Sequence, residues 1–382
     1  MSIRVLEVNV DDLNAGGVYA LIKNVVEHGD SKIKIDICAI EKFQNKKNVE
    51  FFEQRGCNVH YVGYEKNKVI KQVVCIKNEI KLFKREKYDS VHIHADTANK
   101  LLVSGLAAKI AGVKHIIFHS HSSNVDGNHR PLKTAIHKVC KFFLPYIGNE
   151  FVACSDLAAA WMYNKRIKNV IIIKNGIDLD RFAFDEEIRR KIRSKLGINE
   201  ELIIGHVGRF AYQKNHEYII KILERLVKTN DRVKALFVGD GPLRKEIENK
   251  VKQKNLSKNV IFVGMTNNVN EILQAFDIFI LPSRFEGLPI VGVEAQASGL
   301  KTVLSDKITR ETKVLDDVEF LPIEDQFIGD WCKTILNCDN NNLSKRYGAK
   351  KEMEAKGFSI FFTIKQFERL YINSNKRMVE KK

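Results

Sequence analysis

Short apolar runs alternate with longer amphipathic segments along almost the whole chain. The runs are rich in Val, Ile and Phe and end in polar or glycine-containing turns, which is typical of buried strands in parallel sheets. In the first half of the chain they lie at 3–10, 33–40, 58–63, 90–95, 115–120, 150–155 and 170–176. In the second half they lie at 202–209, 233–241, 259–265, 277–283 and 301–306. Because helical segments separate them, the sequence predicts an α/β protein with two doubly wound, Rossmann-like parallel sheets.

A charged helical segment from Asp185 to Leu196 lies between the two groups of strands and is interpreted as a connector. At 382 residues the chain is long enough for two domains, each with its own core. We therefore expect an N-terminal domain over 1–184 and a second domain over 185–356, facing a central ligand-binding cleft. After Gly357, an apolar stripe at helical spacing predicts a closing helix within 357–382 that crosses back to the first domain.

The stretch from Asp277 to Gly299 has the order strand, turn, helix, and Pro289 stands where a first helical residue is favoured. A helix N-terminus has unpaired N–H groups and a partial positive charge, so it attracts an anion. Glu286 in the turn and Glu294 in the helix flank this position. Carboxylates beside an anion are costly unless they accept hydrogen bonds from hydroxyl groups. The pattern favours a nucleotide-sugar; a helix-terminal Glu and a solvated helical Glu are the simpler alternative.

Loops after other strands of the second domain contain groups that suit the same ligand. Arg209 offers a planar fork and Lys214 a point charge, and both suit a diphosphate. Gly239 lets the backbone come near a ligand, and Met265 and Thr266 can present backbone groups to a base. Because the carboxyl ends of parallel strands share one sheet edge, we expect these loops to lie near Glu286 and Glu294.

Glycines and histidines follow strands of the first domain. Gly16 and Gly17 come after the first strand and allow the backbone to approach a ligand closely. His119 and His121 come at the end of the strand at 115–120, where an imidazole can contact a ligand or transfer a proton. A structural hydrogen-bonding role for either histidine stays open, and so does the choice between them. No GxGxxG or P-loop pattern occurs, which disfavours the ordinary dinucleotide and P-loop classes.

Two further polar patterns are interpreted as structural. His92 and His94 lie on the preceding strand and are taken to be sheet-end residues. Asp178 and Asp180 form a DxD tripeptide, which is a metal–diphosphate motif in another class of transferases. Here it lies in a turn that leads out of the domain, so turn and cap chemistry is preferred to metal binding.

The net charge of +16 favours anionic partners such as nucleotides or an acidic membrane surface. Lys and Arg are spread along the chain rather than gathered with aromatic residues, so we expect no nucleic-acid partner. The densest basic interval, Lys66 to Lys87, has apolar residues at helical spacing. It is interpreted as a solvated outer face, with contact to anionic lipid headgroups as the alternative.

Cysteine usage and the N-terminal sequence predict the cellular compartment. The seven cysteines are scattered, odd in number and without a CxxC pair, which favours reduced thiols and disfavours a zinc site. The N-terminal residues resemble a strand rather than a signal peptide, and no apolar run approaches membrane-spanning length. We expect a cytoplasmic protein, with a peripheral position at the inner face of the plasma membrane as a further expectation.

With these residues in place, the chain resembles the GT-B glycosyltransferases of family 4, nearest to enzymes that build bacterial exopolysaccharide and capsule. The resemblance extends over nearly the full length. Its most specific part is the pair Glu286 and Glu294, with seven residues between them, within SRFEGLPIVGVEAQASG. The supporting motifs are GRFAYQKNHE (208–217), FVGDGPLR (237–244), IIIKNGID (171–178) and HSH (119–121).

The resemblance implies transfer of a sugar, with retention of anomeric configuration, from a nucleotide-diphosphate donor to a saccharide or lipid-linked saccharide acceptor. UDP is the common nucleotide of the family, and no metal or other cofactor is expected. Glu286 would contact the transferred sugar near the reacting carbon, and Glu294 would hold the ribose hydroxyls. His121 looks most like the family's histidine near the sugar, although the HSH motif leaves His119 open.

The resemblance also implies how the diphosphate is bound. Backbone N–H groups of Gly287, Leu288 and Ile290 would contact it together with Arg209 and Lys214. Gly16 and Gly17 would approach from the other domain. Two alternatives remain: a nucleotide-sugar epimerase of the same shape, and a non-catalytic subunit that binds a nucleotide-sugar.

Overall fold

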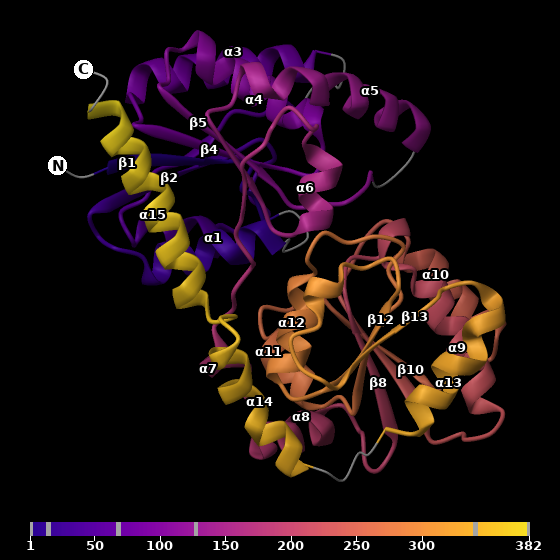
Figure 1. The fold of residues 1–382 in the computed structure, drawn as a ribbon. Helices are drawn as coiled ribbons and strands as arrows, with labels where there is room; N and C mark the ends of the chain where they lie inside the picture. The colour runs from indigo at the N-terminus through magenta and orange to yellow at the C-terminus, as the bar shows by residue number, and fades with distance from the viewer. Residues whose placement is uncertain (1–2, 13–16, 66–69, 126–128, 339–342, 380–382) are drawn as a thin grey trace. The chain divides into compact units, whose positions relative to one another are not determined.

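The computed structural model describes residues 3–12, 17–65, 70–125, 129–338 and 343–379. The chain divides into two compact units, of which unit 1 comprises Met1–Gly176 with Ile360–Lys382 and unit 2 comprises Ile177–Ser359. Each unit has one parallel sheet with helices on both faces (Figure 1). The predicted pair of Rossmann-like sheets is therefore confirmed.

The sheet of unit 1 has the strand order β3-β2-β1-β4-β5-β6-β7, and every pairing is parallel. The order reverses direction between β1 and β4, which is where open α/β sheets bind ligands, at the carboxyl ends of the strands. The strands are β1 (Ile3–Val8), β2 (Ile33–Ala39), β3 (Val59–Tyr61), β4 (Ser90–Ala95), β5 (His115–Ser120), β6 (Glu150–Ala153) and β7 (Val170–Ile172).

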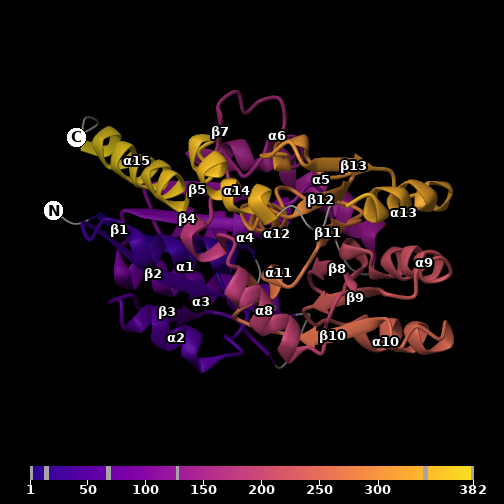
Figure 2. The same cartoon turned by 90° about the horizontal axis from the view of Figure 1, so that it is seen from below.

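The C-terminal helix α15 (Ile360–Val379) belongs to unit 1 and lies beside α1 on one face of this sheet (Figures 1 and 2). Its apolar residues Ile360, Ile364 and Phe367 pack into the same core as Val5 of β1. Helices α3, α4 and α5 pack against one another in sequence. The helices of unit 1 before α15 are α1 (Gly17–His28), α2 (Lys46–Glu53), α3 (Lys71–Glu86), α4 (Ala98–Ile110), α5 (Arg130–Phe143), η1 (Leu144–Tyr146) and α6 (Asp156–Met162).

The sheet of unit 2 has the order β10-β9-β8-β11-β12-β13, again parallel throughout. Its strands are β8 (Leu202–Val207), β9 (Val233–Val238), β10 (Val260–Gly264), β11 (Ile278–Leu281), β12 (Lys301–Ser305) and β13 (Val318–Leu321). Its helices are α7 (Leu179–Phe182), α8 (Glu186–Lys195), η2 (Tyr212–Lys214), α9 (His216–Val227), α10 (Arg244–Gln253), α11 (Val269–Gln274), α12 (Ile290–Ala297), η3 (Arg310–Thr312), η4 (Asp325–Phe327), α13 (Ile328–Leu336) and α14 (Leu343–Ala355). One core lies on each face of the sheet.

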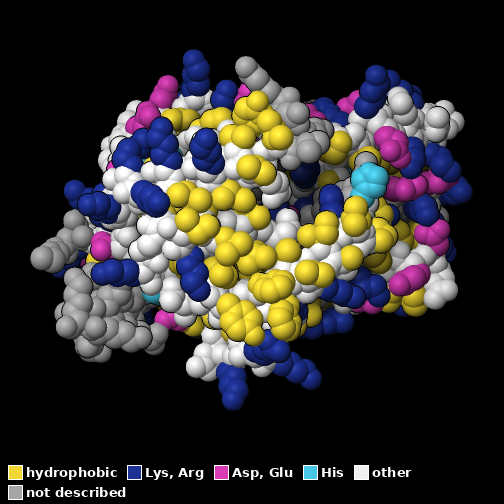
Figure 3. Space-filling model, turned by 90° about the horizontal axis from the view of Figure 1, so that it is seen from above, with side chains coloured by type: hydrophobic (Ala, Val, Ile, Leu, Met, Phe, Trp, Pro, Cys, Tyr) yellow, Lys and Arg dark blue, Asp and Glu magenta, His cyan; other side chains and the backbone are white. Residues whose placement is uncertain are grey.

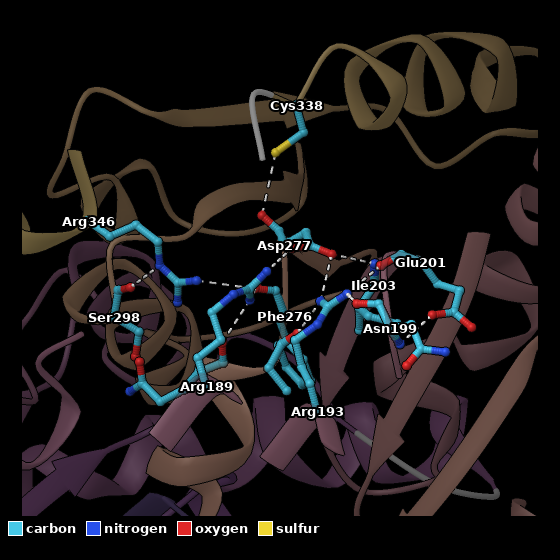
Figure 4. Close-up of polar contacts among 12 residues, drawn as sticks. Arg189, Arg193, Asn199, Glu201, Ile203, Phe276, Asp277, Ser298, Cys338 and Arg346 are labelled. Atoms are coloured by element: carbon cyan, nitrogen blue, oxygen red, sulfur yellow. Dashed lines mark hydrogen bonds and ion pairs between the residues drawn. The ribbon is translucent and has the colours of Figure 1, made fainter. Parts of the chain in front are cut away.

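A buried ionic cluster fixes both ends of the stretch 277–299 (Figure 4). Asp277 accepts hydrogen bonds from Arg189 (2.5 Å), Arg193 (3.2 Å) and the backbone N–H of Ile203 (2.7 Å). Arg346 donates to the carbonyl oxygens of Phe276 (3.2 Å) and Ser298 (2.9 Å), one at each end of the stretch. Burial lowers the pKa of Arg346 to about 9. The strand and the helix that flank the Glu286 loop are therefore tied to one scaffold.

Candidate functional site

The stretch predicted to bind the ligand has the expected order of elements. The loop 282–289 follows β11 and leads into α12. Pro289 is the N-cap residue, with φ −69° and ψ 109°, so the first helical residue is Ile290 and not Pro289 as predicted. The difference arises because ψ of Pro289 is extended, whereas its φ also fits a helix. Gly299 has φ +67° and its N–H binds the carbonyl of Gln296, which confirms the predicted stop.

Glu286 is held by two residues of the loop after β8. Its carboxylate accepts hydrogen bonds from Lys214 Nζ (2.7 Å) and from Gln213 Nε2 (3.0 Å), and only 7% of the residue is exposed. Gln213 also binds the carbonyl of Phe285 at 3.1 Å. Sequence reasoning assigned Lys214 to the diphosphate and gave Gln213 no role. The structure shows that both residues position Glu286.

Asn215 shapes the loop that carries these two residues. It has φ +57°, a left-handed conformation that Asn tolerates better than most residues, and its side chain donates to the carbonyl of Pro282 at 3.1 Å. The backbone N–H of Arg284 donates to Gln213 O at 2.8 Å. These bonds join the loop after β8 to the loop after β11.

Glu294 lies one helix turn inside α12 and is half-buried. Burial raises the pKa of Glu294 to about 7, although the charges of Arg181 and Lys214 act in the opposite direction. No side-chain hydrogen bond to Glu294 is found within the described part of the chain. Lys214 therefore acts on both carboxylates of the predicted pair.

Arg181, on α7, was not predicted from the sequence. It interacts electrostatically with Glu294 and donates to the carbonyl of Asn267 at 2.8 Å. Its neighbour Asp178 caps α7 by accepting from Arg181 N–H at 3.2 Å, and Asp180 forms an ion pair with Lys350. The cap interpretation of the DxD tripeptide is confirmed for Asp178.

The loops after β8, β9 and β10 meet at one edge of the sheet. Gly239 has φ +130°, and a Cβ there would lie 2.3 Å from the carbonyl oxygen of Gly208, so only glycine fits. The N–H of Gly239 donates to Gly264 O at 2.9 Å. Arg209 is exposed in this region, and the structure gives its side chain no ion pair with any described residue.

The remaining predicted donor residues lie in the same unit, with the exception of the two glycines. Met265 follows β10 and is 53% exposed, and Thr266 accepts a hydrogen bond from the N–H of Asn268 at 3.0 Å. Leu288 is buried, whereas Ile290 begins α12, where N–H groups lack helical acceptors. Gly287 lies between Glu286 and Leu288 in the loop.

Of the two glycines predicted in unit 1, only Gly17 can be placed. Gly17 is the first residue of α1 and is exposed. Gly16 lies outside the described residues.

Unit 1 contains a second polar cluster that sequence reasoning missed. Strand pairing places Glu7 beside His92 and His94 beside His119. These four side chains are at most 1% exposed and lie under α15, whose Tyr371 hydroxyl donates to Glu7. His92 and His94 are therefore not sheet-end residues as predicted. Their spacing of two residues turns both to the same buried face of the sheet.

The cluster reaches His121 through His94. Hydrogen bonds join Glu7 Oε2 to His94 Nε2 at 2.7 Å and His94 Nδ1 to His121 Nε2 at 2.8 Å. Burial alone would raise the pKa of Glu7, but His92 and His94 lower it below its ordinary value, so Glu7 is ionised. Burial lowers the pKa of His94 to about 4 and that of His121 well below its usual range, so both imidazoles are neutral.

These protonation states determine which nitrogen of His121 has the proton. Ionised Glu7 can only accept, so His94 donates from Nε2 and accepts at Nδ1. His121 must then donate from Nε2, and its Nδ1 is a hydrogen-bond acceptor. The chain of bonds therefore fixes the tautomer of His121, as a carboxylate does for histidine in many catalytic sites.

The structure distinguishes His119 from His121 by exposure. His119 is fully buried, binds His92 at 3.1 Å through Nδ1, and has no partner for Nε2 among the described residues. His121 is partly exposed.

Nitrogen atoms of His92, His94 and His119 lie within 4.8 Å of one another, close enough to hold a cation. Hydrogen bonds within the cluster already account for these distances.

Comparisons with known proteins identify the family of the chain. The model described as "Glycosyltransferase Family 4" matches residues 15–181, and the model described as "Glycosyl transferases group 1" matches residues 188–321. The chain is 30% identical over 361 residues to the putative glycosyltransferase EpsF of Bacillus subtilis, across 93% of this chain and 92% of EpsF. It is 27% identical over 320 residues to the UDP-Gal:alpha-D-GlcNAc-diphosphoundecaprenol alpha-1,3-galactosyltransferase of Escherichia coli, across 80% of each.

Solved structures show the same fold. HepE of Anabaena in complex with UDP-glucose matches with a TM-score of 0.79, across 97% of this chain and all of HepE, at 17% identity. Sucrose-phosphate synthase of Thermosynechococcus elongatus matches with a TM-score of 0.75, across 98% and 99% of the two chains, at 16% identity. The fold, the two family models and the similarity to EpsF together confirm the predicted family. The chain belongs to the family 4 (group 1) glycosyltransferases of the GT-B fold and is a transferase enzyme.

Proposed function

We propose that this glycosyltransferase moves a sugar, with retention of anomeric configuration, from a UDP-sugar to a saccharide or lipid-linked saccharide in bacterial surface polysaccharide synthesis. The observation that carries the proposal is the arrangement of Glu286 and Glu294 around Lys214 at the start of α12. One carboxylate is fixed by a lysine and an amide, and the other has no direct partner among the described side chains.

Unpartnered Glu294 suits the ribose. A buried polar group without a partner is costly, and two adjacent hydroxyls would supply the hydrogen bonds that the protein does not. An ionised carboxylate accepts from both hydroxyls at once, so donor binding would favour the charged form of Glu294 over the neutral form.

The diphosphate would bind where N–H groups and cations converge. The first turn of α12 offers N–H groups without helical acceptors, and Arg209 offers an exposed guanidinium. In the reaction, negative charge builds on the departing diphosphate, and fixed positive groups stabilise it most. Lys214 supplies one such charge while it holds Glu286 toward the sugar.

His121 is the residue that we propose from unit 1. Its tautomer is fixed by Glu7 and His94, so its Nδ1 can accept a hydrogen bond from a sugar hydroxyl. Neutral His121 also adds no positive charge that would compete with the cations of unit 2. We expect no metal or other cofactor to take part.

The names of two relatives support the acceptor class, and the net charge of +16 supports a position at an anionic membrane. The relative from E. coli is named for an acceptor linked to diphosphoundecaprenol, and one from Staphylococcus aureus for capsular polysaccharide biosynthesis. We propose a lipid-linked or free saccharide acceptor and a cytoplasmic enzyme at the inner face of the plasma membrane. No nucleic-acid partner is proposed.

The purified protein should be incubated with a panel of nucleotide-sugars, with and without saccharide and lipid-linked acceptors. We expect one UDP-sugar to give a glycosylated product whose anomeric configuration, measured by NMR, equals that of the donor. An epimerised donor in the absence of acceptor would identify an epimerase instead. Tight donor binding without turnover on any acceptor would favour a binding subunit.

A further inference from the structure

Helix α5 exposes its apolar side instead of burying it. The exposed fractions are 62% for Leu132, 44% for Ile136, 63% for Val139 and 47% for Phe143. These residues recur at intervals of three and four, so they form one stripe along the helix. In a helix of a globular domain, such a stripe normally faces the core.

The opposite side of α5 contacts the protein through polar groups. His137 Nδ1 accepts from the N–H of Ala98 at 3.0 Å, and its ring stacks on Trp161 at 3.9 Å. Lys141 Nζ donates to the carbonyls of Ala160 (2.7 Å) and Trp161 (2.6 Å). Polar bonds fix the rotation of the helix, so the apolar stripe is held toward the outside.

The apolar surface continues beyond α5. Ile110 at the end of α4 is 60% exposed and Tyr146 of η1 is 57% exposed. Lys109 Nζ donates to the carbonyl of Tyr146 and so joins the two segments. Figure 3 shows hydrophobic side chains gathered in a band on this side of the molecule, with Lys and Arg side chains around it. An exposed apolar patch of this kind marks a protein or membrane contact.

The charged residues around the patch favour a membrane over a protein as its partner. Residues 97–149 contain one acidic residue and seven basic residues, although Lys141 lies on the opposite side of α5 and Lys100 pairs with Asp96 just outside this range. Lys133 and Lys138 flank the apolar stripe and are exposed. Lys138 also lines an open hollow of about 610 Å³ together with His129 and Arg130. Apolar residues between basic ones are typical of a helix that lies in the surface of an anionic membrane.

The helix at 71–86 does not share this arrangement. Within α3, Phe83 is buried and Ile76 and Ile80 are half-buried, so the apolar side of the helix faces the protein. Only Val73, at 67%, is as exposed as the residues of α5. The described part of this basic interval therefore exposes less apolar surface than α5 does.

No helix in the described ranges has the length and apolar content needed to cross a membrane. We propose that the outer face of α5, with η1 and the end of α4, binds the surface of an anionic phospholipid membrane. Leu132, Val139 and Phe143 enter the boundary between headgroups and acyl chains, while Lys133 and Lys138 contact lipid phosphates. This surface would keep the enzyme at a membrane independently of its sugar chemistry.

The test is sedimentation of the full-length protein with vesicles of phosphatidylcholine alone or mixed with phosphatidylglycerol. We expect binding to the mixed vesicles, weakened by salt. The double substitution Val139→Ser and Phe143→Ser should lower the partition coefficient about tenfold, since both side chains leave the interface. Lys133→Gln and Lys138→Gln should each lower it about fivefold.

The matched control is Val73→Ser, which removes an equally exposed valine from α3. It should leave vesicle binding unchanged, and thermal unfolding should show that all variants are folded. Equal loss of binding in Val73→Ser and in the α5 variant would overturn the proposal. The proposal would also be overturned if the wild-type protein bound neither kind of vesicle. It would be overturned as well by a dimer that Val139→Ser disrupts, because a second copy would then cover the stripe. Binding is measured without nucleotide-sugar, so the result does not depend on the proposed transfer reaction.

Discussion

Units 1 and 2 each contain a glutamate that is shielded from water near the carboxyl end of the sheet. The pKa of the first glutamate is lowered and that of the second is raised. Glu7 in unit 1 is fully buried, which raises its pKa, yet the pKa lies below the ordinary value because the charge and hydrogen bonds of His92 and His94 outweigh burial. Glu294 in unit 2 is only half-buried, yet burial raises its pKa to about 7. Arg181 and Lys214 act on it without a direct hydrogen bond.

The comparison indicates that histidines in direct contact can offset the effect of burial and keep a carboxylate charged. The unit 1 cluster uses its hydrogen bonds internally and so can fix His121 in one tautomer. The unit 2 cluster leaves one carboxylate without a direct partner in the described structure, and we propose that a ligand completes it. The two clusters therefore have different expected roles, one in positioning and one in binding.

The largest expected effect is on Glu286, the unit 2 carboxylate with direct partners. Glu286→Gln keeps the shape of the side chain but removes its negative charge. That charge pairs with Lys214 and, in the proposed reaction, stabilises the transition state. We expect kcat to fall about 100- to 1000-fold with donor affinity nearly unchanged. The measurement is steady-state kinetics together with calorimetric donor binding. Glu200→Gln, on an exposed surface pair with Arg232, is the control and should keep full activity.

Glu7→Gln tests the unit 1 cluster. Tyr371 and His94 donate to different oxygens of Glu7, and glutamine replaces one of these oxygens by an NH2 donor, so one buried donor loses its acceptor. We expect the free energy of unfolding to fall by about 2–3 kcal/mol at pH 7, measured by urea denaturation. The pKa of Glu7 is lowered on folding, so the wild-type contribution is present above its ordinary pKa and is lost in acid.

Glu79 provides the matched control for Glu7. It is also 0% exposed, but burial raises its pKa to about 7 and Ser104 is its hydrogen-bond partner at 2.8 Å. A raised pKa means that stability is lost as pH rises above the ordinary value toward 7. Glu79→Gln should therefore keep or increase stability at pH 8. A loss equal to that of Glu7→Gln would show that burial alone, and not the partners, explains both sites.

Lys214→Met should have a smaller effect than Glu286→Gln, because Gln213 still holds Glu286. We expect kcat/KM to fall about tenfold, as one charge near the diphosphate is lost. Lys221→Met, which removes an exposed pair with Asp325, is the control. An unchanged kcat/KM in Lys214→Met would show that this lysine serves only the folded structure.

Apolar patterning was sufficient to predict most of the fold but not the contacts at the sites. Twelve runs were interpreted as strands, and each corresponds to a strand of the structure. The strand that was missed, β13 (Val318–Leu321), has four residues and includes charged Glu319, so it gives little signal. The pair Glu286 and Glu294 was found because both lie within one short stretch.

Contacts between distant segments could not be predicted in this way. Lys214 contacts Glu286 because β8 and β11 are neighbours in the sheet, which places the loops that follow them side by side. The sequence does not show which strands are neighbours. Glu7 and His94 come from strands that are adjacent only once the sheet reverses direction. The sequence does indicate that Glu7 needs a partner, because it lies at a buried strand position. Which residue is that partner depends on the pairing and register of the strands, which the sequence does not show.

The smallest expected effect, and the most specific, is the pH dependence of donor binding through Glu294. Because burial raises its pKa to about 7, about half of the carboxyl groups are protonated at neutral pH in the free protein. If ribose hydroxyls bind the ionised form, affinity for a nucleotide-sugar should rise about tenfold from pH 6 to pH 8, with proton release on binding. Calorimetry in buffers of different ionisation enthalpy measures both quantities.

In Glu294→Gln the rise should disappear, and affinity at pH 8 should fall about fivefold because one neutral acceptor replaces a carboxylate. A nucleotide-sugar is preferred to free UDP as the probe, since its diphosphate does not titrate in this range. Retention of the same pH dependence by Glu294→Gln would assign it to another group. Glu294 would then resemble Glu79, a buried carboxyl without a ligand, and the contrast between the two units would no longer support a donor site at α12.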